Sequence, residues 1–188
     1  MAPTANSKSL SWIESTGGPL LLLERELLPY WHGILENGVT GTDYDRACRI
    51  ADYVGAIEVG PGVGLILGEE PFSTTWWQSE DLLNSFLVRW VCAEDEAKVR
   101  AVLSSLSSGN QWQPTDVRIL VDSELILFDS SCPGTDIDDY LTIKIAAGRY
   151  TVETLYYSPN DELSLILHRF VPRPSAQLLR HTDYSLQK

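Results

Sequence analysis

The sequence contains few of the residues that form covalent cross-links or metal centres. Its 188 residues include three cysteines, three histidines and one methionine. The cysteines (Cys48, Cys92 and Cys132) are odd in number and widely spaced, so they match neither a disulfide framework nor a zinc motif. We therefore expect no metal site and a reducing compartment, the cytoplasm.

Long apolar runs are absent as well. No stretch approaches the roughly 18 apolar residues that a membrane-spanning helix needs. Residues 1–11 hold one lysine and no apolar block, so we interpret them as a disordered polar tail and not as a signal peptide. This pattern again favours a cytoplasmic protein.

Basic charge is scarce. Lys and Arg number 14 against 26 Asp and Glu, which gives a net charge of −12. A general nucleic-acid binder needs a basic surface, and an anionic membrane would repel this chain, so we expect neither partner. The same charge would attract a basic protein.

Motifs for catalysis and cofactor binding are missing. The chain has no phosphate-binding Gly-x-x-x-x-Gly-Lys-Ser/Thr loop, no Gly-x-Ser-x-Gly elbow and no His-Glu-x-x-His pair. His168 lies between Leu167 and Arg169 in an apparent strand, and we expect it to be structural and hydrogen-bonded. We therefore predict no catalytic residue and no cofactor.

The pattern of short apolar runs between turn residues predicts an α+β fold, mainly antiparallel sheet with two principal helices. One helix begins after Thr42, with Asp45 completing a capping box, and its apolar face continues to Val54. The other covers residues 94–106. Strands are expected at 20–23 and 86–92, hairpins at 57–67 and 117–128, and a meander of three strands at 141–145, 150–156 and 163–170.

One compact domain is expected over residues 12–171, followed by a tail at 172–188 with a short helix near 175–180. A polar break at 107–111 subdivides the domain into two halves. Leu65-Ile-Leu-Gly-Glu-Glu-Pro71 in the first half is similar to the run from Leu125 to Pro133 in the second. A duplication and two hairpins that merely look alike both explain this similarity.

Acidic residues concentrate between positions 116 and 139, where seven carboxylates oppose Arg118 alone. Asp136, Asp138 and Asp139 follow Pro133-Gly134 and are expected in an exposed loop. One interpretation is a solvated loop that gives solubility. The other is a docking patch, including Asp129 at its start, for a basic surface such as the phosphate-binding cleft of a nuclease.

Two further sets of residues are candidates. Trp76 and Trp77 are adjacent in a predicted loop, where they either anchor a protein interface or cap the core. Glu69, Glu70 and Asp129 lie at strand ends, where catalytic acids often sit. They leave open a small enzyme or a ligand-binding β domain that uses these carboxylates with His168.

Five segments stand out together, and they are Trp12-Ile-Glu-Ser-Thr-Gly-Gly-Pro19, Thr42-Asp-Tyr-Asp-Arg-Ala-Cys48, Leu67-Gly-Glu-Glu-Pro71, Leu87-Val-Arg-Trp90 and Leu127-Phe-Asp-Ser130. In their order and spacing they resemble the immunity protein 21 family of bacterial polymorphic toxin systems, and the resemblance extends over residues 12–171. The third departs from the family's Gly-Asp-Glu-Pro form, because Glu69 replaces Asp. No catalytic residues transfer from the family, and the shared motifs are interpreted as fold determinants.

The resemblance implies a cytoplasmic antidote that binds a cognate toxin domain and blocks it without chemistry. Within that hypothesis, the partner-binding residues are Asp129, Asp136, Asp138 and Asp139 first, Trp76 and Trp77 second, with Glu69 and Glu70 beside them. A regulatory interaction module without a toxin is a further alternative.

Overall fold

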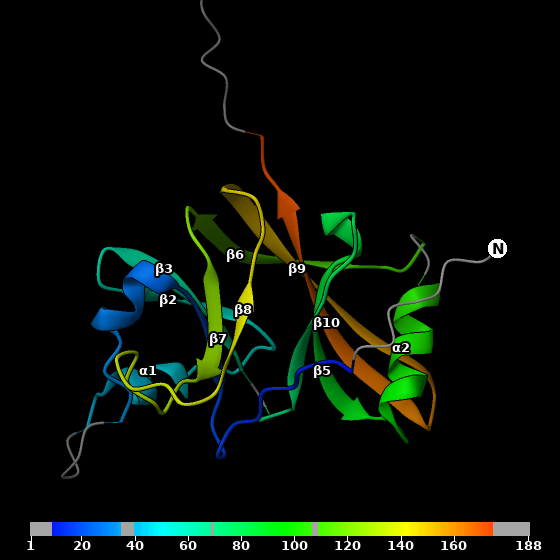
Figure 1. The fold of residues 1–188 in the computed structure, drawn as a ribbon, viewed down its shortest axis with the longest axis horizontal. Coiled ribbons are helices and arrows are strands. Elements are labelled where there is room, and N and C mark those ends of the chain that lie inside the picture. Colours follow the sequence, from blue (N-terminus) through cyan, green and yellow to red (C-terminus); the bar gives the residue numbers. More distant parts are fainter. Residues whose placement is uncertain (1–8, 35–39, 69, 107–108, 175–188) are drawn as a thin grey trace, which may run out of the picture.

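The computed structural model describes residues 9–34, 40–68, 70–106 and 109–174, and in these residues ten strands form two antiparallel sheets (Figure 1). The first sheet has the strand order β2 (Gly55–Val59), β3 (Gly62–Leu67), β1 (Leu20–Glu24), β7 (Leu125–Asp129) and β8 (Tyr140–Ile143). The second has the order β4 (Thr74–Trp77), β5 (Phe86–Cys92), β10 (Leu163–Pro172), β9 (Gly148–Asn160) and β6 (Gln113–Val121).

Strand β1 shows why the two sheets pack against each other. Its four leucines are all buried, with exposed fractions of 0–2 %. Leu20 and Leu22 point into the core shared with the second sheet, whereas Leu21 and Leu23 point to the opposite face. A continuous apolar run suits a central strand that is covered on both faces.

Short helices cover the two outer faces. The 3₁₀ helix η1 (Arg25–Tyr30) and α1 (Asp43–Ala47) cover the first sheet, and α2 (Glu96–Ser105) covers the second (Figure 1). A further 3₁₀ turn, η2 (Leu82–Asn84), precedes β5. Asp95 caps α2 by accepting a 2.8 Å hydrogen bond from the Lys98 N–H. The predicted α+β class and the helix near residues 94–106 are confirmed.

The first predicted helix is shorter than the sequence pattern indicated. Its capping box is present, because the Asp45 N–H donates to Thr42 Oγ1 and the Thr42 N–H donates to Asp45 Oδ2. However, α1 ends at Ala47 and does not reach Val54. The Tyr53 carbonyl accepts hydrogen bonds from the Gly68 N–H and from Arg89. These tertiary contacts hold the following segment against the sheets and override its helical periodicity.

Two predicted strand pairings are wrong. Strands β6 and β7 do not form a hairpin, because they belong to different sheets, and β8 pairs with β7 and not with β9. The turn after β6 is instead bonded to the end of β1, because Glu24 Oε1 accepts hydrogen bonds from the N–H groups of Asp122 and Ser123. The β2–β3 and β9–β10 hairpins are confirmed.

Each sheet takes strands from both sides of residues 107–111. This interleaving supports our proposal that residues 12–171 are one folding unit. The helix predicted near residues 175–180 lies outside the described residues. Within the described ranges, no helix is long and apolar enough to cross a membrane.

Candidate partner-binding surface

The acidic loop, residues 130–139, connects β7 to β8. Asp129 stands at its base and is 8 % exposed. Its carboxylate accepts hydrogen bonds from the N–H and hydroxyl of Thr16, both 2.8 Å, and from the Ser131 N–H at 2.9 Å. Burial by itself would raise the pKa of Asp129, but these hydrogen bonds outweigh burial and hold the pKa below its usual value.

The acidic loop is tied to the segment that follows η1. Trp31 Nε1 donates to the Ser130 carbonyl at 2.9 Å, and the Gly134 N–H donates to the Trp31 carbonyl at 2.8 Å. Gly134 lies so close to Leu28 that a Cβ there would meet the Leu28 carbonyl oxygen at 2.1 Å. Only glycine permits this approach, so the loop has a fixed place on the scaffold.

The acidic loop presents its carboxylates outward. Asp136, Asp138 and Asp139 are exposed, whereas Ile137 packs against the core beneath them. Burial raises the pKa of the nearby Cys132 thiol, and the charges of Asp129, Asp138 and Asp136 raise it further. The raised pKa favours the protonated thiol over the thiolate. The carboxylates around it make the loop a region of concentrated negative charge.

Three large apolar side chains are exposed next to this charge, a feature that the sequence reasoning missed. Tyr140 begins β8 directly after the loop, and Tyr30 and Ile34 flank the Trp31–Gly33 segment that holds it. Their exposed fractions are 46 %, 50 % and 51 % respectively. Apolar side chains beside charged ones are typical of the core and rim of a protein interface.

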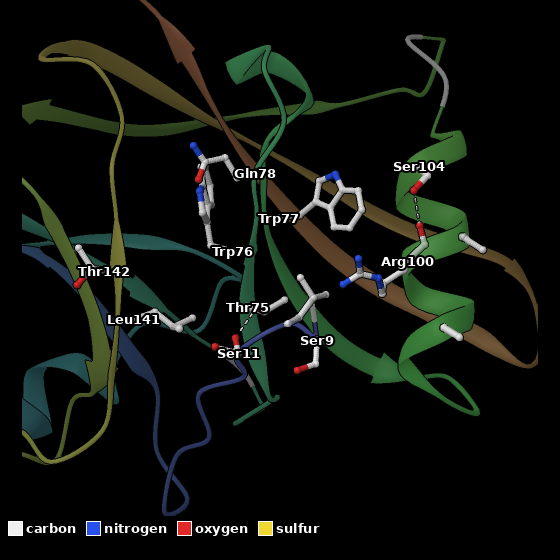
Figure 2. Close-up of a pocket in the computed structure, with 13 residues that line it drawn as sticks. Ser9, Ser11, Thr75, Trp76, Trp77, Gln78, Arg100, Ser104, Leu141 and Thr142 are labelled. Carbon is white, nitrogen blue, oxygen red and sulfur yellow. Dashed lines mark hydrogen bonds between the residues drawn. The ribbon is translucent and has the colours of Figure 1, made fainter. Parts of the chain in front are cut away.

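Trp76 and Trp77 end strand β4 and do not lie in the predicted loop. Because neighbouring residues of a strand point to opposite faces, Trp76 packs between the sheets against Phe170, and Trp77 lies on the outer face beside Arg100. Both are partly buried, and both line a cavity of about 930 Å³ that α2 and β8 also border (Figure 2).

The remaining candidates do not converge on one site. Glu69 lies outside the described residues, and Glu70 is exposed. His168 is fully buried between the sheets, and its Nδ1 lies 2.9 Å from Thr154 Oγ1. Burial, and then the charge of Arg89, hold the pKa of His168 well below its usual value. The contacts of Asp129 and of His168 share no residue, and the described residues contain no metal-binding cluster.

Arg89 is the buried charged residue that the sequence reasoning missed. It is 1 % exposed and donates to the carbonyls of Tyr53, Gly68 and Glu70 at 2.6–3.0 Å. Its guanidinium also lies over the Phe72 ring, 5.4 Å from the ring centre. The sequence does contain a signal for this burial, because Arg89 is the one charge inside the otherwise apolar run Leu87-Val-Arg-Trp90.

The acidic loop is thus held at a fixed place on a scaffold of two sheets. Comparison with known families identifies the class of protein. The sequence model of the family Immunity protein 21 matches residues 11–163, and the chain belongs to that family. No curated protein and no solved structure matches the chain.

The motifs that carried the family resemblance meet in pairs in the structure. Thr16 and Pro19 bond to Asp129 and Ser130, and Arg89 bonds to Gly68. Tyr44 lies against Gly18, where a Cβ would come within 2.3 Å of the tyrosine hydroxyl. Their interpretation as fold determinants therefore has a physical basis.

Proposed function

We propose that this protein binds the toxin domain made by its own cell or by a sibling cell, and neutralises it by direct contact in the cytoplasm. In this proposal the protein performs no catalysis. The observation that carries it is the acidic loop, which Trp31 and Gly134 fix in place while Asp136, Asp138 and Asp139 stay exposed. Membership of the immunity protein family supports the same function.

The partner surface that fits the acidic loop is basic, like the substrate cleft of a nuclease. Three carboxylates in one loop offer several negative charges at close spacing, as a nucleic-acid backbone does. Such a loop would speed the encounter with a basic cleft and occupy the place of the phosphates. Asp129 has a different role in this proposal, because its oxygens are engaged within the chain and order the base of the loop. Glu69 and Glu70 stay in the proposal as a secondary acidic contact.

Coexpression with the toxic domain encoded by the neighbouring gene tests the proposal. We expect the protein to restore growth and to copurify with that domain in a one-to-one complex. The control is an unrelated acidic protein of similar size, which should do neither. Continued killing together with the absence of a complex would refute the proposed function.

A further inference from the structure

Strand β4 forms one edge of the second sheet, and β5 is its partner on the other side. The Trp90 N–H of β5 donates to the Ser73 carbonyl at 2.9 Å, just before β4 begins. In an antiparallel pair, alternate residues point their backbone groups to the same side. The backbone N–H and C=O groups of Thr75 and Trp77 therefore point toward β5. Those of Thr74 and Trp76 point toward the open edge.

The N-terminal segment occupies only the first of these two positions. Ile13 and Thr74 exchange two hydrogen bonds, each 2.8 Å. A continuing strand would pair Ser11 with Trp76 next. Instead, the Ser11 carbonyl accepts a 2.6 Å hydrogen bond from Thr75 Oγ1, and the Leu10 N–H donates to Glu96 of α2.

Residues 9–12, which precede Ile13, therefore do not follow the edge. They cross the outer face of the second sheet instead. Within the described part of the chain, no hydrogen bond occupies the backbone N–H and C=O of Trp76 on the open side. These two groups are the hydrogen-bonding pair that an added strand would use.

The edge groove, defined as the cavity of about 930 Å³ beside β4, lies along this position. Figure 2 shows Trp76 and Trp77 between Arg100 of α2 on one side and Leu141 and Thr142 of β8 on the other. On the helix side, Arg100 and the exposed small residues Ala97, Ala101 and Ser104 of α2 border the groove. Ser9, Leu10 and Ser11 of the N-terminal segment line it as well.

We propose that the edge groove receives an extended segment of the toxin domain, which adds to the second sheet as a strand beside β4. This inference rests on the proposed function. The acidic loop runs directly into β8, so Asp139 at its end is two residues before Leu141 of the groove wall. A toxin that docks on the acidic loop is thereby brought next to the open edge.

The chemistry of β4 favours backbone recognition. Edge strands are usually protected by lysine, proline or a bulge, and Thr74-Thr-Trp-Trp77 has none of these. Strand addition takes its affinity from main-chain hydrogen bonds, and side-chain pockets set the choice of segment. The apolar faces of Trp76 and Trp77 provide such contacts.

Residue-resolved amide hydrogen exchange, measured by NMR on the full chain, tests the added strand. The probe is the toxic domain encoded by the neighbouring gene. We expect complex formation to slow exchange of the Trp76 amide about tenfold or more, because a backbone hydrogen bond forms there. The amides of Thr75 and Trp77 should exchange slowly with and without the toxin. Unchanged Trp76 exchange in a complex that has formed would overturn the inference.

Two variants of α2 give an independent test. Ala101→Trp fills the groove from an exposed helix position, and Ser105→Trp places the same side chain on an exposed position outside the groove lining. We expect Ala101→Trp to weaken toxin binding about tenfold or more, while Ser105→Trp stays within about twofold of the original protein. Circular dichroism checks that both variants fold.

The outcomes separate the two proposals. If Ala101→Trp binds the toxin as tightly as the original protein, the groove is not the docking site, and the proposed function stands. If the original protein does not bind the toxin, the proposed function fails and the groove inference fails with it. A free protein that is a dimer with a protected Trp76 amide would assign the edge to a second copy and overturn the inference.

Discussion

Asp129 accepts two hydrogen bonds from Thr16, a residue 113 positions earlier in the chain. The pair ties the start of the acidic loop to the segment that enters β1. We expect Asp129→Asn to lower the free energy of unfolding by about 1–3 kcal/mol, because an amide accepts these bonds less strongly than a carboxylate. Urea denaturation measures the loss.

The matched control for this change is Asp138→Asn in the exposed part of the same loop, which should leave the stability nearly unchanged. The pKa of Asp129 is lowered in the folded protein, so its contribution is present above the unfolded pKa and is lost as the pH falls through the folded value. A variant Asp129→Asn with the original stability at pH 7 would contradict the role given to this carboxylate.

Arg89 holds three backbone carbonyls at the crossing between the two sheets. Lysine keeps the charge but cannot reach all three with one planar group, so we expect Arg89→Lys to cost about 2–4 kcal/mol of stability. Arg100→Lys on α2 is the control and should cost much less, because Arg100 is only half-buried. Chemical denaturation of both variants at the same pH decides the comparison.

His168 makes the stability of the folded protein depend on pH. Its folded pKa lies well below the usual value because of burial and the nearby Arg89 charge. The unfolded chain therefore binds a proton at His168 below about pH 6.5 while the folded chain does not, and stability falls as the pH falls. The slope from this group is at most about 1.4 kcal/mol per pH unit.

Replacing His168 with glutamine should remove that part of the slope. Glutamine keeps a polar group within reach of Thr154. The control variant is His32→Gln, because His32 is exposed. Urea midpoints measured from pH 7.5 to pH 5 compare the three proteins. Parallel curves for His168→Gln and the original protein would show that His168 does not titrate on unfolding.

Charge reversal tests the acidic loop as the docking surface. We expect the triple variant D136K/D138K/D139K to lower the association rate with the toxin domain about tenfold or more at low salt, because steering becomes repulsion. The difference should shrink at high salt. The variant E80K/D161K/E162K changes the same total charge at exposed positions outside the loop and is the control. Equal association rates for the two variants would remove the loop from the interface.

Local sequence signals predicted the parts of the fold that are decided locally. The Thr42 and Asp45 capping box was found from a spacing of three residues, and β1 from four consecutive leucines. The pairing of β6 and β8 was not found, because a short turn fits both a hairpin and a crossing between sheets. In this protein the turn bonds to Glu24, about a hundred positions earlier, and β7 pairs with β1, which no local pattern indicates.

For the candidate surface, too, local sequence predicted some features and tertiary contacts determine the others. The exposure of Asp136, Asp138 and Asp139 followed from their position after Pro133-Gly134. The engagement of Asp129 and the burial of Arg89 depend on Thr16, Tyr53 and Gly68, which no local pattern connects to them. The open edge at Trp76 depends on where the N-terminal segment turns away, which is likewise a tertiary property.

Strand β10 is the last strand of the described chain, yet it is the middle strand of the second sheet. During synthesis, β4 and β5 leave the ribosome with their central neighbour still missing, and β9 and β6 have no place to join them. The second sheet is therefore assembled only once residue 172 has emerged. A chain that ends before β10 would leave β4 with β5 and β9 with β6 as two separate strand pairs, so the second sheet depends on translation through residue 172.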